Sequence, residues 1–191
     1  IQTPTVSAPF GLSTFTDVKT GSVKYSLDVS FRGMDTDPKI KEFHDKMQDI
    51  DNLLIKEGVA HSKEWFGKKM SKEVIQEFYR PLVKPSKDPE KYAPTMKFKI
   101  QTPRDGSVAV DAYDYTKQKV DIMEALVPGI KIQGILECNS VWFVGKNMYG
   151  ISWRLAQVKI QKSDKISGFS FLEDSDAEEE EENEEKHEED L

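Results

Sequence analysis

Apolar and polar residues alternate in several separate stretches of this chain, and this period of two most constrains its fold. Residues 23–32 place an apolar side chain at every second position, as a strand with one buried face does. The period returns later, and Arg104-Asp105-Gly106 is a turn signal that predicts a hairpin of the strands on either side of it. The further strands that the pattern predicts are 95–102, 107–115, 129–137, 140–144 and 149–162.

One long segment has a different period. Within residues 37–56, apolar side chains recur at steps of three and four, which indicates an amphipathic helix. Asp37 and Pro38 suit the cap and the first helical position, and Gly58 is a plausible end. Shorter helices are predicted over 71–79 and 119–126.

This order of elements predicts a mainly β protein, an OB-fold-like five-stranded Greek-key barrel with a helical insertion at about 37–80. The barrel domain is expected to span residues 21–172, after a loose N-terminal segment at 1–20. Residues 173–191 are expected to form a disordered acidic C-terminal tail. The order lacks the strand–helix alternation of parallel α/β folds.

Charge is segregated along the chain. Of its 34 acidic residues, 13 lie in 173–191 beside a single lysine. That segment therefore carries a net charge of −12, and residues 1–172 carry +5. Blocks of like charge repel themselves and commonly serve as interaction tails, so we expect a basic body and an acidic tail with separate roles.

The sequence contains no positive signal for catalysis. Its one cysteine, Cys138, excludes an internal disulfide and a cysteine-based zinc site, and its three histidines lack metal-ligand spacing. Nucleotide-binding and nucleophile-elbow motifs are missing. We therefore predict a non-enzymatic protein without a cofactor, and an N-terminal sequence without a signal peptide predicts that it is not secreted.

Basic and aromatic residues are interleaved in three regions of the body, 61–87, 97–115 and 142–154. Binding single strands needs cations for the phosphates and flat rings on which bases stack. The candidate nucleic-acid-binding residues are Trp65, Phe66, Lys68, Lys69, Tyr79, Arg80, Lys97, Lys99, Arg104, Tyr113, Tyr115, Trp142, Lys146, Tyr149, Trp153 and Arg154.

Several of these rings have a structural alternative. Trp153 lies in phase with the apolar positions of its strand, which suits the core. Trp142 and Phe143 are strand neighbours and so point to opposite faces, with one of them outside the core. Trp65 and Phe66 stand in polar surroundings, as stacking platforms or as an anchor for their loop.

The layout resembles the replicative single-stranded DNA-binding proteins of short-tailed phages and their relatives in nucleocytoplasmic large DNA viruses. The likeness is carried by the strand order, the helical insertion, the carboxylate run 174–190, and the segments 62–70, 78–84 and 145–154. It implies single-strand binding in replication, recombination or repair, and contact of the tail with polymerase or helicase partners. It implies a nuclear or cytoplasmic viral replication site. RNA binding and a homodimer are left open, and no membrane association is expected.

The charge split also suggests a mechanism, in which the tail competes with nucleic acid for the cationic groove. Two other functions fit the same composition. An acidic-tailed chaperone of histones or other basic proteins would bind through the tail, and a virion-associated structural protein would use the barrel for assembly.

Overall fold

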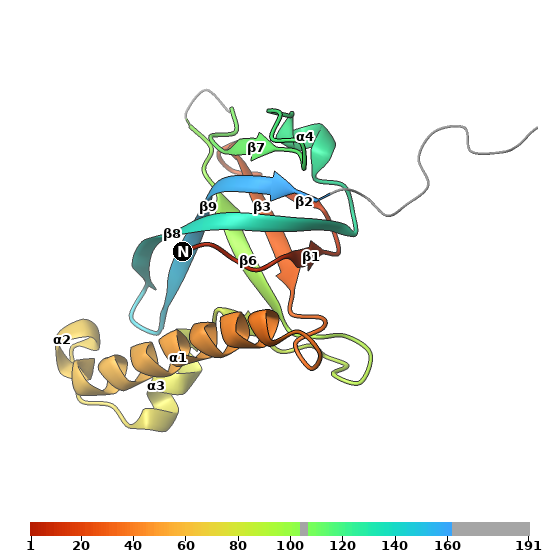
Figure 1. Ribbon diagram of the computed structural model, residues 1–191. Helices are drawn as coiled ribbons and strands as arrows, with labels where there is room; N and C mark the ends of the chain where they lie inside the picture. Colours follow the sequence, from red (N-terminus) through yellow and green to blue (C-terminus); the bar gives the residue numbers. More distant parts are fainter. Residues whose placement is uncertain (104–106, 162–191) are drawn as a thin grey trace, which may run out of the picture.

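The computed structural model describes residues 1–103 and 107–161, and nine strands of these residues join in one sheet. Five of them close a ring, since β3 is antiparallel to β6, β6 parallel to β9, β9 antiparallel to β8, and β1 bridges β8 and β3. Figure 1 shows this barrel above a layer of helices. The ring confirms the OB-fold-like barrel with a helical insertion. The strands are β1 Val6–Ala8, β2 Leu12–Thr16, β3 Val23–Ser30, β4 Tyr79–Arg80, β5 Val83–Lys84, β6 Thr95–Ile100, β7 Asp111–Tyr113, β8 Ile130–Val144 and β9 Met148–Ile160.

The alternation decides which side chains fill the barrel. Leu27 and Val29 of β3 and Phe98 of β6 are fully buried, because every second residue of a strand points to the same face. The residues between them, such as Ser26 and Lys99, point outward. The outer surface of these strands is therefore polar.

The helical insertion consists of α1 Pro38–Ala60, α2 Ser62–Phe66 and α3 Lys72–Phe78, and a short α4 Ile122–Ala125 precedes β8. Asp37 caps α1 as expected, because its Oδ1 accepts a hydrogen bond from the Lys39 amide at 2.8 Å. The prediction that Gly58 ends this helix is wrong. Gly58 lies inside α1, where a Cβ atom would stand 2.3 Å from Oη of Tyr149.

A buried carboxylate fastens α1 to the chain that returns to the barrel. Asp51 accepts hydrogen bonds from Oη of Tyr79 at 2.7 Å and from the amide of Leu82 at 2.9 Å. Burial raises the pKa of Asp51, while these hydrogen bonds oppose the rise. Buried carboxylates are tolerated only with such partners, so this contact fixes the insertion on the barrel.

The predicted hairpin around Arg104 does not form in the described residues. β7 pairs in parallel with β9, Asp111 opposite Gln157, and β6 meets β9 at Lys99 and Arg154. The alternating pattern predicted the two strands but not their partners. Among the described strands, both β6 and β7 pair with the long strand β9 and not with each other.

The N-terminal segment is expected to be loose with one short strand near residues 12–18; the structure confirms that strand as β2 and adds β1. The amino group of Ile1 donates to the carbonyl of Leu136 at 2.7 Å. The ladder between β8 and β9 shifts register at Ile135/Leu136, opposite the point where the apolar alternation slips in the sequence. Such a shift of register marks a β-bulge.

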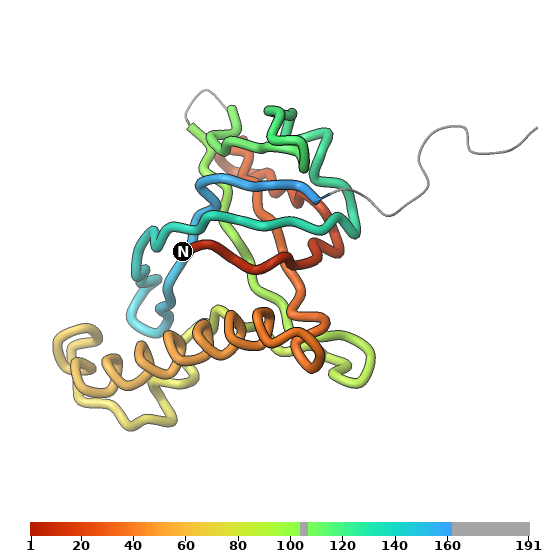
Figure 2. Tube along the Cα trace, viewed as in Figure 1, coloured from red at the N-terminus to blue at the C-terminus, as the bar shows by residue number. Residues whose placement is uncertain are grey.

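The β8–β9 hairpin extends beyond the barrel. Figure 2 shows its tip near the far end of α1, and the rings of Trp65 and Phe66 in α2 contact the hairpin there. No described helix is both long and apolar enough to span a membrane.

Candidate nucleic-acid interface

Four basic side chains share the outer face of β3, β6 and β9, and we call them the cationic face: Lys24, Lys97, Lys99 and Arg154. Register brings them together, since Ser26 opposes Lys99, which in turn opposes Arg154. Directly opposed residues of neighbouring strands place their side chains on one face. These residues lie up to 130 positions apart in the chain.

Two of the four cations already have partners. Nζ of Lys97 lies 2.7 Å from Oδ2 of Asp28, and Nε of Arg154 lies 2.7 Å from Oε2 of Glu137. These pairs cancel the charges of Asp28 and Glu137. A third carboxyl, Asp17, lies near Lys24 beyond ion-pair distance, and its pKa is lowered mainly by the backbone amides of Thr20 and Lys19 and to a smaller extent by the charge of Lys24. The positive charge that remains belongs to Lys24 and Lys99.

Lys24 and Lys99 have no ion-pair partner within the part of the chain that the structure describes. The pKa of Lys99 is lowered, first by burial and then by the charge of Lys24. Like charges held close together repel each other, and an anion bound between them would relieve that repulsion. Lys24 was not among the predicted site residues, because only the pairing of β3 with β6 reveals its position.

An exposed ring adjoins these two lysines. Phe15 of β2 lies directly opposite Lys24 of β3, and 63% of its surface is exposed. Sequence reasoning missed Phe15 because its segment is not rich in basic residues. The face thus offers a flat apolar side chain next to unpaired cations.

Four predicted binding rings lie in the interior. Phe66, Tyr79, Tyr149 and Trp153 are all less than 9% exposed, so no base can stack on them in this structure. Burial raises the pKa of Tyr149 to about 12, and its hydroxyl donates to the carbonyl of Leu54 at 3.0 Å.

The structure brings the predicted regions 61–87 and 142–154 together, but their rings pack against one another and do not form a binding surface. The ring centroids of Trp65 and Phe143 lie 5.5 Å apart, and those of Phe66 and Tyr149 lie 5.4 Å apart. Such ring pairs stabilise the fold beyond the contribution of the apolar area that they bury. This aromatic cluster anchors the β8–β9 hairpin on the helical insertion.

An open groove of about 570 Å³ runs beside Trp65 and Phe143. Glu57 and Glu64 line it, and both contact the ring of His61, at 3.4 and 3.1 Å. Carboxylates at a groove oppose the approach of phosphates. This groove is therefore a poorer path for nucleic acid than the cationic face.

The remaining predicted residues are dispersed. Lys68 and Lys69 are exposed between α2 and α3, Arg80 is exposed in β4, and Lys146 is exposed in the turn between β8 and β9. Arg104 lies outside the described residues.

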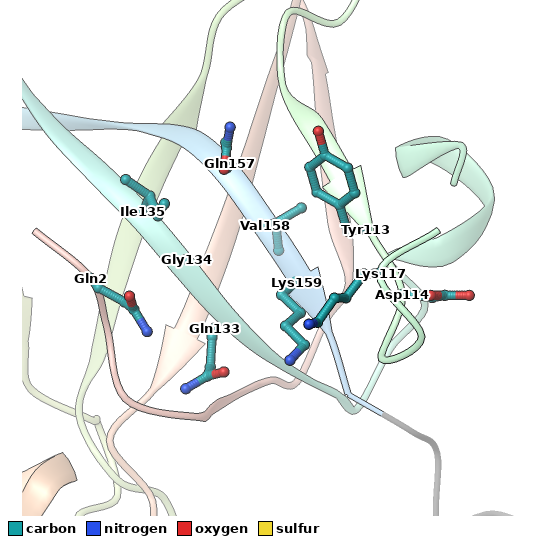
Figure 3. A pocket seen from close by; sticks show the side chains of 10 residues that line it. All are labelled: Gln2, Tyr113, Asp114, Lys117, Gln133, Gly134, Ile135, Gln157, Val158 and Lys159. Atoms are coloured by element: carbon teal, nitrogen blue, oxygen red, sulfur yellow. The ribbon is translucent and has the colours of Figure 1, made fainter. Parts of the chain in front are cut away.

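Three predicted rings also keep some exposure. Trp142 is half-buried over Gly150, where a Cβ would stand 2.7 Å from its ring. Tyr115 is exposed after β7, and Tyr113 lines a pocket of about 260 Å³ together with Lys159 (Figure 3). Among the described side chains, no group of three or more His, Cys, Asp and Glu residues gathers as a metal site would require.

Residues 26–171 match the profile of a family described as a family of unknown function, DUF5871. The chain belongs to this family. A comparison with curated proteins finds no match. Membership in this family therefore assigns no function to the chain.

Solved structures of phage proteins share this fold. The single-stranded DNA-binding protein of bacteriophage Enc34, in complex with single-stranded DNA, superposes with a TM-score of 0.52 at 15% identity, covering 87% of this chain and 88% of that chain. The protein gp2.5 of bacteriophage T7, a single-stranded DNA-binding protein, has a TM-score of 0.52 at 12% identity and covers 91% and 97%. A second structure of the Enc34 protein gives 0.51 at 18%, covering 92% and 88%. At these identities the likeness establishes a common fold.

Proposed function

We propose that this protein binds single-stranded DNA across the outer face of β2, β3, β6 and β9. The observation that carries the proposal is the pair Lys24 and Lys99, two neighbouring cations without an ion-pair partner among the described residues. Backbone phosphates would occupy the space between them, since phosphate contacts supply most of the sequence-independent affinity for nucleic acid.

Phe15 favours a single strand over a duplex. A base that stacks on an exposed ring must be unpaired, and such stacking contributes about 1–3 kcal/mol per base. A strand running across the strands of the barrel would place phosphates at Lys24 and Lys99 and a base at Phe15. The shared fold with the Enc34 and T7 proteins supports this reading.

The proposal extends to the role of the protein and to the segment 173–191. We place its activity in DNA replication, recombination or repair of a virus, at a nuclear or cytoplasmic replication site. The net charge of −12 in 173–191 would let this segment compete for the cationic face, and polymerase or helicase partners would bind it once DNA displaces it. The charge split of the sequence supports this extension.

The decisive experiment titrates labelled oligo-dT into the full chain and into the variant Lys24→Gln/Lys99→Gln, with fluorescence anisotropy as the readout. Removing two phosphate contacts should weaken binding by roughly tenfold at low salt and should reduce the slope of log affinity against log salt by about 1.4. Unchanged affinity and slope in the double variant would reject the proposed face.

A charge-matched control is Lys41→Gln/Lys46→Gln. These two exposed lysines of α1 pair with Asp45 and Glu42, each four residues away, and Figure 1 shows α1 in the helical layer below the barrel. The control removes two positive charges, as the double site variant does. Its affinity for oligo-dT should match that of the unmodified protein.

A further inference from the structure

The pocket beside β7 combines a ring, amides and cations on one small surface (Figure 3). The strand register places Gln133 of β8, Lys159 of β9 and Tyr113 of β7 in one row. Gln157 stands in the next row, opposite Ile135. The volume of about 260 Å³ lies just below the range of small-molecule sites, which begins at about 300 Å³, so the pocket suits one small ligand.

Lys117 reaches this pocket from a strained turn. Its φ of 70° is the one positive value at a non-glycine residue within the described ranges, and only Asn, Asp and Gly adopt that region readily. Oδ1 of Asp114 holds the turn by accepting hydrogen bonds from the amides of Thr116 and Gln118, at 2.8 and 2.9 Å. Figure 3 shows the Lys117 side chain running from this turn toward Lys159. Residues held in such conformations cluster at ligand clamps.

Two lysines at the pocket keep an unpaired positive charge. In the described part of the chain neither Lys117 nor Lys159 has an ion-pair partner. The nearby carboxylate of Asp111 lies 2.7 Å from Nζ of Lys119. Asp114 keeps its negative charge, because hydrogen bonds from Thr116 and Gln118 lower its pKa, but Figure 3 shows its carboxylate directed away from Lys117 and Lys159. Two lysines at one pocket attract a dianionic group, and phosphate is such a group.

We infer that this pocket binds one phosphorylated nucleotide unit. The base lies against the ring of Tyr113, the phosphate lies between Lys117 and Lys159, and the amides of Gln133 and Gln157 offer hydrogen bonds to polar atoms of the ligand. The identity of the ligand as a nucleotide rests on the proposed function. The pocket itself is separate from the cationic face, because no residue is common to both.

The unit has two sources, a free nucleotide and a nucleotide within or at the end of a bound strand. Calorimetric titration of the full chain with dTMP, thymidine and inorganic phosphate tests the free form. Oligo-dT with a 5′-phosphate, compared with oligo-dT ending in a 5′-hydroxyl, tests the strand end. Tighter binding of the phosphorylated oligonucleotide would assign the pocket to a strand end, and equal binding with equal losses in pocket variants would assign it to a nucleotide inside the strand.

Three variants test the chemistry. Lys117→Asn and Lys159→Gln each remove one cation and should weaken dTMP binding by roughly tenfold. Tyr113→Leu removes the ring face and should weaken it at least about fivefold. Because Asn tolerates a positive φ, Lys117→Asn should melt at the same temperature as the unmodified protein or higher. A purely structural role of Lys117 would instead lower the melting temperature.

The control is Lys91→Gln, an exposed lysine paired with Asp88 at 3.1 Å, which should leave dTMP binding unchanged. The inference fails if thymidine binds as tightly as dTMP, or if both lysine variants bind dTMP like the unmodified protein. If the pocket variants lose dTMP binding but keep full oligo-dT binding, the pocket takes the free nucleotide. If they keep both while Lys24→Gln/Lys99→Gln loses oligo-dT binding, the inference is wrong and the proposed function stands. If the pocket variants lose oligo-dT binding while Lys24→Gln/Lys99→Gln keeps it, the cationic face is not the binding surface and the inference about the pocket stands.

Discussion

At the scale of single residues, Lys99 carries a property that separates it from an ordinary surface lysine. Its pKa is lowered, first by burial and second by the positive charge of Lys24. A bound phosphate would stabilise the protonated form and raise that pKa again. Binding is therefore coupled to the protonation of this one side chain.

This coupling predicts a pH dependence. The contribution of Lys99 to oligo-dT affinity should be complete below its lowered pKa and should be lost as the pH rises through that value, before unperturbed lysines titrate near about 10.4. Lys99→Arg stays protonated throughout and should show a flatter profile. Anisotropy titrations between about pH 7 and about pH 10 measure the difference. Parallel profiles for the two proteins would show that Lys99 does not bind phosphate.

At the scale of elements, α1 and the β8–β9 hairpin hold each other in place. Gly58 lets α1 approach the ring of Tyr149, whose hydroxyl bonds to the carbonyl of Leu54 in the same helix at 3.0 Å. The ring clusters beside this contact extend the packing to α2 and to Phe143. The insertion and the hairpin are thus one packed unit.

A substitution at that contact tests the unit. Gly58→Ala should destabilise the protein by about 1–3 kcal/mol through overpacking, although alanine favours a helix by about 1 kcal/mol over glycine. Urea unfolding measures the change.

A second variant isolates the cause. Tyr149→Phe removes the oxygen that the new methyl group meets, so Gly58→Ala should cost less in a Tyr149→Phe background. Equal costs in the two backgrounds would mean that the hydroxyl group is not the obstacle.

At the scale of the whole molecule, opposite charges occupy different parts of one chain. Residues 1–172 carry +5 and residues 173–191 carry −12, and the acidic segment lies outside the described residues. An acidic segment tethered to a basic face competes at a high effective concentration. The proposed function therefore includes self-competition.

Deletion of residues 173–191 should tighten oligo-dT binding at low salt, and the gain should shrink as salt screens the competition. Anisotropy titrations at several salt concentrations measure both effects. A full-length variant with these carboxylates changed to amides should match the deletion, which separates charge from length. Unchanged affinity at low salt after deletion would end the competition hypothesis.

Local patterns accounted for much of the fold but less of the site. The period of two predicted the strands β3, β6, β8 and β9, and the three- and four-residue steps predicted α1, because burial on one face leaves a local trace. The same patterns identified Lys99 and Arg154 as candidates. They could not show that Tyr79 and Tyr149 are buried, since that depends on the packing of the insertion against the hairpin.

The sequence by itself determined which residues of β3 and β6 face the core, where the long helix begins, and that the acidic charge is separate from the body. These properties depend only on neighbours along the chain. Only the tertiary structure decided that β7 joins β9, that α1 passes through Gly58, and that Lys24, Lys99 and Phe15 share one surface. Strand register between distant segments is set by how their apolar faces pack together, and no local pattern records it.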